Sequence, residues 1–206
     1  MAYLLGRKEF YGLELSVNPS VLVPRPETEL LVDLALERNP VRVLDLGTGS
    51  GAVALAIKKE RPRSVVVAVD ADLSALQTAQ RNATKHHLDI DFRHGRWFEP
   101  VAGERFDLVV SNPPYVAEGD PHLPDLRHEP REALVAGPDG LDCIRDIAAR
   151  VREHLSPGGR VLIEHGQGQD GAVRALLAGA GLEAVATWPD LAGIGRVTGG
   201  TLGGKE

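Results

Sequence analysis

The segment "SNPPY" (residues 111–115) places an amide, two prolines and an aromatic ring directly after the apolar run "FDLVV". Proline cannot continue a central strand, so Pro113 and Pro114 end it and hold the next backbone groups rigidly. The side-chain carbonyl of Asn112 and the main-chain carbonyl of Pro113 could each accept one N–H of a planar NH2 group, with Tyr115 covering its plane. Taken alone, the segment is more typical of a strand end with a turn, so its chemistry depends on what lies beside it.

A glycine-rich turn, "VLDLGTGSG" (residues 43–51), has the pattern of a strand, a turn and the start of a helix. Gly47, Gly49 and Gly51 let the backbone turn sharply and approach a ligand without a Cβ in the way, and the following helix offers its positive N-terminus. With Ala52 in the last place, the same glycines match the dinucleotide pattern G-x-G-x-x-A. The glycines alone therefore leave the ligand open.

Two carboxylates narrow the choice of ligand. Asp45 lies inside the predicted strand two residues before Gly47, where it would repel a pyrophosphate and attract a cation. Asp70 ends the next predicted strand, where a carboxylate can accept hydrogen bonds from both hydroxyls of a ribose. S-adenosylmethionine has a sulfonium, an ammonium and a ribose but no phosphate, so we expect it rather than NAD. Capping of the next helix, the alternative role for Asp70, suits Asp72 better.

An open sheet must bring these residues together. From residue 41 onward, short apolar strands alternate with helical segments, which predicts a mostly parallel sheet with helices on both faces. The fourth strand of this series would end beside the strand that carries Gly47, so residues 112–115 would face the methyl group of the cofactor. In "RWFEP", Trp97 or Phe98 could lie against an adenine, although core packing suits either ring equally.

The N-terminal part and one long connection complete the predicted organisation. Residues 3–23 are typical of two short strands, "YLLGRKEFYG" and "LELSVNPSVLV", with a turn near Gly12. The stretch from Pro26 to Glu29 suits a helix N-terminus, because apolar residues follow it at helical spacing. The long connection, residues 116–140, is rich in Pro, Asp and Glu, and we expect it to form a functional lid or wall.

Composition excludes several classes of protein. The chain has 206 residues, 43% of them hydrophobic and 25% charged, which suits one main globular domain. A net charge of −6 argues against a grip on a long nucleic-acid backbone. Cys143 is the single cysteine, and its apolar helical setting predicts a core filler. The histidines lack ligand spacing, so we expect no metal. No signal peptide or membrane-spanning run is apparent, so we expect a cytoplasmic protein.

Seven segments in order give the chain a resemblance to a known enzyme family. They are "LGRKEFYG", "VLVPRPETELLV", "VLDLGTGSG", "VDADLSALQTAQRNA", "SNPPY", "HEPREALVAGPDGLD" and "LIEHGQGQ". The series resembles the HemK/PrmC family, the protein-(glutamine-N5) methyltransferases that modify the Gly-Gly-Gln loop of class 1 peptide chain release factors. "NPPY" is shared with adenine methyltransferases, whereas "PRPETE" and "EPREAL" are much more specific.

The resemblance implies a fold, a cofactor and a site. The fold would be α/β, a Rossmann-like class I S-adenosylmethionine-dependent methyltransferase domain over residues 26–206, preceded by a β-hairpin appendage over residues 1–25. The residues implied to contact the cofactor are Gly47, Thr48, Gly49, Ser50, Gly51, Asp70, Trp97 and Asn112. The residues implied to hold the glutamine amide of a release factor are Asn112, Pro113, Pro114 and Tyr115.

The chain departs from the family pattern in two places. Family members usually carry an N-terminal helical domain before the hairpin, whereas this chain begins at the hairpin, so we expect weaker recognition of the distant parts of a partner. Family members also tend to have an aspartate before the "WF" or "LF" pair, where this chain has Arg96. A carboxylate near the adenine amino group is then absent or comes from elsewhere.

Three other functions match parts of the pattern. An N-P-P-Y-type adenine or guanine N-methyltransferase would act on a flipped base, but the acidic charge and the absence of a basic recognition segment argue against it. A non-catalytic S-adenosylmethionine-binding interaction protein would have no use for Asn112 and Tyr115. A dinucleotide oxidoreductase is disfavoured by Asp45.

Overall fold

A seven-stranded sheet forms the centre of the computed structural model, which describes residues 2–204. The spatial order is β5-β4-β3-β6-β7-β9-β8. The strands are β3 (Arg42–Leu46), β4 (Val65–Asp70), β5 (Asp91–His94), β6 (Phe106–Ser111), β7 (Leu155–Glu164), β8 (Glu183–Pro189) and β9 (Gly195–Thr201). Neighbours from β5 to β7 pair in parallel, and β9 pairs antiparallel with both β7 and β8. The predicted mostly parallel sheet is confirmed.

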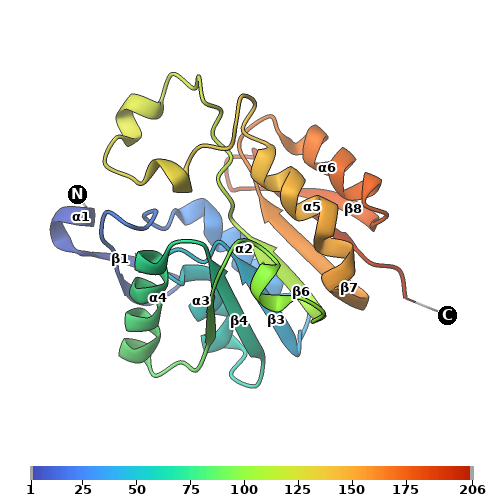
Figure 1. Cartoon of the computed structure of the whole chain (residues 1–206), viewed down its shortest axis with the longest axis horizontal. Helices are drawn as coiled ribbons and strands as arrows, with labels where there is room; N and C mark the ends of the chain where they lie inside the picture. The colour runs from blue at the N-terminus through green and yellow to red at the C-terminus, as the bar shows by residue number, and fades with distance from the viewer. Residues whose placement is uncertain (1, 205–206) are drawn as a thin grey trace.

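Helices cover both faces of this sheet (Figure 1). One face packs α2 (Glu29–Leu36), α3 (Ala52–Glu60) and α4 (Leu73–His86) around alternate strand residues such as Val43 and Val110. The other face packs α5 (Asp142–His154) and α6 (Asp170–Gly179) around the intervening residues, such as Leu44 and Val109. Because both faces are buried, the central strands are apolar at nearly every position, as parallel sheets require.

The N-terminal hairpin is present but shorter than predicted. β1 (Arg7–Phe10) pairs antiparallel with β2 (Leu13–Ser16), and the two residues of the turn, Tyr11 and Gly12, both have positive φ, as tight hairpins require. The strand expected at residues 3–5 is wrong, because α1 (Ala2–Leu5) is a helix that ends at Gly6 with a φ of 66°. The second strand ends at Ser16, and the chain then runs through a turn toward the sheet.

The long connection at residues 116–140 contains two short 3-10 helices, η3 (Leu123–Leu126) and η4 (Arg131–Ala133), and one bridge between Val116 and Val135. It lies at the top of Figure 1, in yellow, apart from the layers of the sheet. The other 3-10 helices are η1 (Pro26–Thr28), which leads into α2, and η2 (Glu99–Val101). Within residues 2–204, no helix is both long and apolar enough to span a membrane.

Candidate active site

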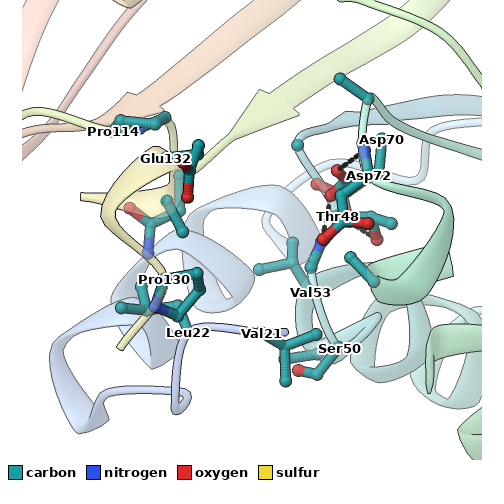
Figure 2. Close-up of a pocket in the computed structure, with 18 of the residues that line it drawn as sticks. Val21, Leu22, Thr48, Ser50, Val53, Asp70, Asp72, Pro114, Pro130 and Glu132 are labelled. Atoms are coloured by element: carbon teal, nitrogen blue, oxygen red, sulfur yellow. Dashed lines mark hydrogen bonds between the residues drawn. The ribbon is translucent and has the colours of Figure 1, made fainter. Parts of the chain in front are cut away.

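A cavity of about 620 Å³ opens at the carboxyl ends of β3, β4 and β6. This edge of an open α/β sheet is where ligands bind, since loops diverge there and leave a crevice. The glycine turn and Asp70 line one part of the cavity, and the segments at residues 20–24 and 130–133 line another. Figure 2 shows Leu22, Pro130 and Glu132 on one side and Thr48, Asp70 and Asp72 on the other.

The turn after β3 is fixed to β4 by its own backbone. The N–H groups of Gly47 and Thr48 both donate to the carbonyl of Val69, at 2.9 and 3.0 Å. Gly51 has a φ of 83°, and a Cβ there would lie 3.0 Å from Leu55 and 3.1 Å from Ala79. A side chain at Gly51 would therefore separate α3 from α4. The rest of the turn, residues 47–50, lines the cavity directly.

Asp70 braces this turn from the end of β4. One carboxylate oxygen accepts the N–H of Gly49 at 2.8 Å, and the other accepts the N–H of Asp72 at 2.9 Å. Burial raises the pKa of Asp70 above its usual value, and these backbone hydrogen bonds oppose the rise. The side chain of Asp72 accepts from the N–H of Ser74 at 2.7 Å and so caps α4, as predicted from the sequence.

Asp45 lies beneath the same turn and is 2% exposed. Its Oδ2 accepts the hydroxyl of Thr48 at 2.7 Å. Burial raises the pKa of Asp45 to about 7, because an ionised carboxylate in an apolar surrounding lacks the solvation of water. A cation in the cavity would stabilise the ionised form.

The charges of the cavity suit S-adenosylmethionine better than a phosphate ligand. Asp45, Asp70 and Asp72 all line it near the glycine turn. Among its lining residues Arg96 is the one basic side chain, and its guanidinium is already paired with Asp146 at 2.7 Å. A sulfonium and an ammonium would meet carboxylates here, whereas a pyrophosphate would be repelled. Within residues 2–204 no group of acidic, histidine or cysteine side chains has the arrangement of a metal site.

The structure separates the two aromatic candidates. Trp97 lines the cavity, and its Nε1 is buried without a hydrogen-bond partner among the described residues. Phe98 is fully buried in the core and stacks on His154, with ring centroids 4.4 Å apart. Cys143 is half-buried and also lines the cavity, so the expectation of a core filler is wrong. The apolar pattern of α5 predicts which face of the helix is buried. It does not predict that the N-terminal end of that face, where Cys143 lies, borders the cavity.

Asn112 enters the cavity directly after β6. Its Nδ2 donates to the hydroxyl of Thr28 at 3.1 Å, while its Oδ1 is buried and has no hydrogen-bond partner among residues 2–204. A buried carbonyl without a partner is costly, so this oxygen offers a ready acceptor. Pro114 lines the cavity as well, and Pro113 is buried.

Tyr115 lies against Glu164 and is not among the described residues that line the cavity. Its hydroxyl lies 3.4 Å from Oε1 of Glu164, and burial together with this carboxylate raises its pKa. Gly51, Pro113 and Tyr115 all lie outside the described lining of the cavity, although their neighbours in sequence belong to it. Tyr115 therefore supports the wall behind Asn112 and Pro114 in this structure.

Several lining residues were missed by the residue-level reading of the sequence. Thr28 comes from the "PRPETE" segment, and Pro130, Glu132 and Ala133 come from the "HEPREAL" segment. An ion pair between Arg25 and Glu129 joins these two segments. Neither segment contains a recognisable catalytic pattern. The family resemblance that both segments carry was the one signal that could have identified these lining residues.

Comparison with known proteins identifies the family. The family described as "Methyltransferase small domain" matches residues 26–129. A "Release factor glutamine methyltransferase" of Xylella fastidiosa (strain Temecula1 / ATCC 700964) is 53% identical over 99% of this chain and 77% of the relative. A relative of the same name in Neisseria gonorrhoeae is 50% identical over 96% of this chain and 75% of its own length. The chain belongs to the release factor glutamine methyltransferases.

Solved structures of low sequence identity share the fold. A methyltransferase from Pyrococcus furiosus superposes with a TM-score of 0.73, at 20% identity, over 93% of this chain and 90% of that one. The 16S rRNA N2 G1207 methyltransferase of T. thermophilus, solved in complex with AdoMet and guanosine, has a TM-score of 0.71 at 22% identity, over 95% of this chain and 49% of that one. These likenesses confirm the predicted class I methyltransferase fold.

Proposed function

We propose that this enzyme transfers a methyl group from S-adenosylmethionine to the side-chain amide nitrogen of the glutamine in the Gly-Gly-Gln motif of class 1 peptide chain release factors. The observation that carries the proposal is the buried Oδ1 of Asn112, which has no hydrogen-bond partner within residues 2–204 and lies in the same cavity as the glycine turn and Asp70. An acceptor in this position matches the N–H of a planar amide. The high identity to relatives named for this activity supports the same substrate.

The cofactor end of the cavity comprises residues of several loops. We assign its contacts to Asp45, Gly47, Thr48, Gly49, Ser50, Gly51, Asp70, Trp97 and Asn112. Each oxygen of Asp70 accepts one backbone N–H and keeps a lone pair, which leaves capacity for ribose hydroxyls. The ring of Trp97 would lie against the adenine. When bound, S-adenosylmethionine supplies an electrophilic methyl group on its sulfonium.

The substrate end needs orientation more than a strong base. The lone pair of an amide nitrogen is delocalised into its carbonyl, so the nitrogen is a weak nucleophile and gains most from being held in line with the methyl group. The side-chain carbonyl of Asn112 and the main-chain carbonyl of Pro113 would accept its two N–H groups. Pro114 and Tyr115 would fix these two acceptors and limit access of water.

Mass spectrometry of the substrate tests the proposal. Release factor, duplex DNA and RNA are each incubated with the enzyme and methyl-labelled S-adenosylmethionine, together with a release factor whose Gly-Gly-Gln glutamine is changed to alanine. We expect label on the glutamine of the native release factor alone. Label on nucleic acid and none on release factor would favour the base-methylating alternative and reject the proposal.

A variant at Asn112 tests the mechanism. Asn112→Ala should lower kcat at least ~10-fold, about 1.4 kcal/mol, and leave the affinity for S-adenosylmethionine nearly unchanged, because the acceptor acts on the substrate amide. Asn39→Ala, at an exposed asparagine before β3, is the matched control. Retention of more than a tenth of the parental kcat would show that Asn112 does not position the amide.

We further propose a cellular and structural setting for the reaction. Since release factors act in translation, the enzyme would work in the cytoplasm, on a protein partner and without direct binding to nucleic acid. Residues 1–25 would serve as an appendage to the methyltransferase domain at residues 26–206. The hairpin is attached to α4 through Asn82, which bonds both backbone groups of Ser16, and the link that follows it lines the cavity.

A further inference from the structure

Thr28 is a buried hydroxyl for which the proposed reaction has no assigned role. It ends η1, is 3% exposed and lines the cavity. Its Oγ1 accepts a hydrogen bond from Nδ2 of Asn112 at 3.1 Å. A buried hydroxyl that accepts a hydrogen bond can still donate its own O–H to another group. The group that accepts from Thr28 decides which edge of the Asn112 amide the Thr28 oxygen can hold.

Glu164 is the buried carboxylate next to Asn112 in the sheet, and it is the candidate acceptor. β7 runs parallel to β6 with Ser111 opposite Ile163, so Asn112 and Glu164 follow at adjacent strand ends. Glu164 is 1% exposed; its Oε1 lies 3.4 Å from the Tyr115 hydroxyl, and its Oε2 has no hydrogen-bond partner among residues 2–204.

Thr28 and Glu164 both lie beside Asn112, Thr28 through its hydrogen bond to Nδ2 and Glu164 at the end of the neighbouring strand. Burial raises the pKa of Glu164 to about 7, and the Thr28 side chain and the charge of Arg196 oppose that rise, while Glu27 adds to it. Tyr115, the other polar group that faces the carboxyl, also lowers the pKa through its hydroxyl. The carboxylate is therefore poised between its two protonation states in a setting where the Thr28 hydroxyl stabilises the ionised one.

We propose that the Thr28 hydroxyl donates to the buried carboxylate of Glu164, and that these two positioning residues fix which edge of the Asn112 amide meets the substrate. An ionised carboxylate only accepts hydrogen bonds, so in this arrangement the Thr28 O–H would donate to Glu164 and the Thr28 oxygen would be left to accept from Asn112. That oxygen can then hold only the NH2 edge of Asn112, and Oδ1 must face the cavity. A reversed amide would present NH2 to the NH2 of the substrate and could accept nothing.

This inference rests on the proposed function for its kinetic consequence, but the hydrogen-bond arrangement itself does not. The carbonyl and NH2 edges of an asparagine have nearly the same shape, so packing alone selects weakly between them. The proposed hydrogen-bond chain from Asn112 through Thr28 to Glu164 would supply the selection. The same carboxylate, near the Tyr115 hydroxyl, would also hold the ring that supports the "NPPY" segment.

Two substitutions at Thr28 separate positioning from packing. Thr28→Val keeps the shape and removes the hydroxyl, whereas Thr28→Ser keeps the hydroxyl and removes a methyl group. We expect kcat on release factor to fall at least ~10-fold in Thr28→Val and to stay within ~3-fold of the parent in Thr28→Ser, with the KM for cofactor unchanged in both. A purely structural role predicts the reverse order, because valine fills the site better than serine.

Glu164→Gln tests the direction of the chain. A glutamine can donate as well as accept, so it no longer dictates the orientation of the Thr28 hydroxyl. At saturating cofactor, kcat of the parent should fall as pH drops below about 7, because protonation of Glu164 removes the enforced acceptor. This fall in kcat at low pH should be absent in Glu164→Gln, and the maximal kcat of the variant should be lower than that of the parent. A fall that persists unchanged in the variant would contradict the assignment.

A spectroscopic measurement keeps this inference separate from the proposed function. The side-chain NH2 signals of Asn112, identified by their loss in Asn112→Ala, should exchange slowly with water in the parent and in Thr28→Ser and rapidly in Thr28→Val. If the parent transfers no methyl group to release factor but shows this protection pattern, the proposed function falls and the hydrogen-bond chain stands. If the parent is active and Thr28→Val matches it in both kcat and protection, the positioning role is overturned.

Discussion

Asp70 serves two parts of the site with one carboxylate. It holds the glycine turn through Gly49 and the start of α4 through Asp72, and it lines the cavity between them. Such a residue couples the shape of the loop to the occupancy of the site, because the backbone of the loop and the ligand would donate to the same carboxylate. Removal of the Asp70 carboxylate should therefore weaken ligand binding and loosen the glycine turn at the same time.

Asp70→Asn should weaken binding of S-adenosylmethionine by about 1.5–3 kcal/mol, the range for a lost charge-assisted hydrogen bond. One of the two oxygens becomes an NH2 group, which cannot accept from the backbone or from a ribose hydroxyl. Titration calorimetry measures the effect, with Asp89→Asn at an exposed position as the matched control. Equal affinities of Asp70→Asn and the parent would reject the ribose assignment.

At the residue scale, sequence reasoning reaches the groups whose function has a local pattern. The glycine turn, Asp70 and Asn112 follow strands that are readable from their apolar runs, and the structure brings them to one cavity. The contact between Asn112 and Thr28 joins residues 84 positions apart, and no local pattern encodes it. The sequence also could not decide whether Trp97 or Phe98 lines the cavity, because either aromatic ring suits the cavity or the core.

The connection between β6 and α5 is the element that distinguishes this cavity from an open crevice. Pro130, Glu132 and Ala133 form part of its wall, and the ion pair of Arg25 with the nearly buried Glu129 ties that wall to η1. One oxygen of Glu129 is buried without a partner among the described residues, so the carboxylate depends on Arg25 for compensation. A buried charge that loses its partner destabilises its surroundings strongly.

Arg25→Met should loosen the connection and leave the glycine turn intact, because methionine keeps the apolar stem and removes the charge. Hydrogen-exchange mass spectrometry should show faster exchange for peptides within residues 116–140 and no change for peptides covering β3 and α3. Arg127→Met, an exposed arginine on the same connection, is the control. Unchanged exchange in Arg25→Met would show that other contacts hold the wall.

At the element scale, the alternating strands and helices were predictable because their apolar runs are long and bounded by turns. The four residues of α1 were not, since so short an apolar run fits a period of two as well as one of 3.6. The second strand of the hairpin was predicted to continue to Val23, but it ends at Ser16, which pairs with Arg7, the first residue of β1. Because residues 2–5 form α1, a longer second strand has no partner strand there to pair with.

Across the whole molecule, the parallel sheet brings buried carboxyls to the carboxyl ends of its strands. Asp45 lies in β3 and Glu164 ends β7, and burial raises the pKa of each to about 7. Their usual values are 3.8 and 4.5. The folded state thus binds these protons more tightly than the unfolded chain does, so the site is built at the expense of stability at neutral pH.

The sign of the pH dependence follows from these shifts. A carboxyl with a raised folded pKa contributes its stability fully below about pH 4, and that stability is lost as pH rises toward 7. Asp45→Asn and Glu164→Gln remove the titrating group, so the free energy of unfolding of each variant relative to the parent should rise between pH 5 and pH 7. A fully titrating group gives a slope of about 1.4 kcal/mol per pH unit, so a gain on the order of 2 kcal/mol is expected.

Urea unfolding at half-unit pH intervals measures this difference, with Asp89→Asn as a control whose offset from the parent should not vary with pH. Saturating S-adenosylmethionine adds a second arm. Its positive charge beside Asp45 should favour the ionised form, so the pH dependence contributed by Asp45 should flatten while that of Glu164 persists. If the free energy of unfolding of parent and variants changed with pH in the same way, both carboxyls would stay ionised in the folded state. The claim that burial raises their pKa values would then be wrong.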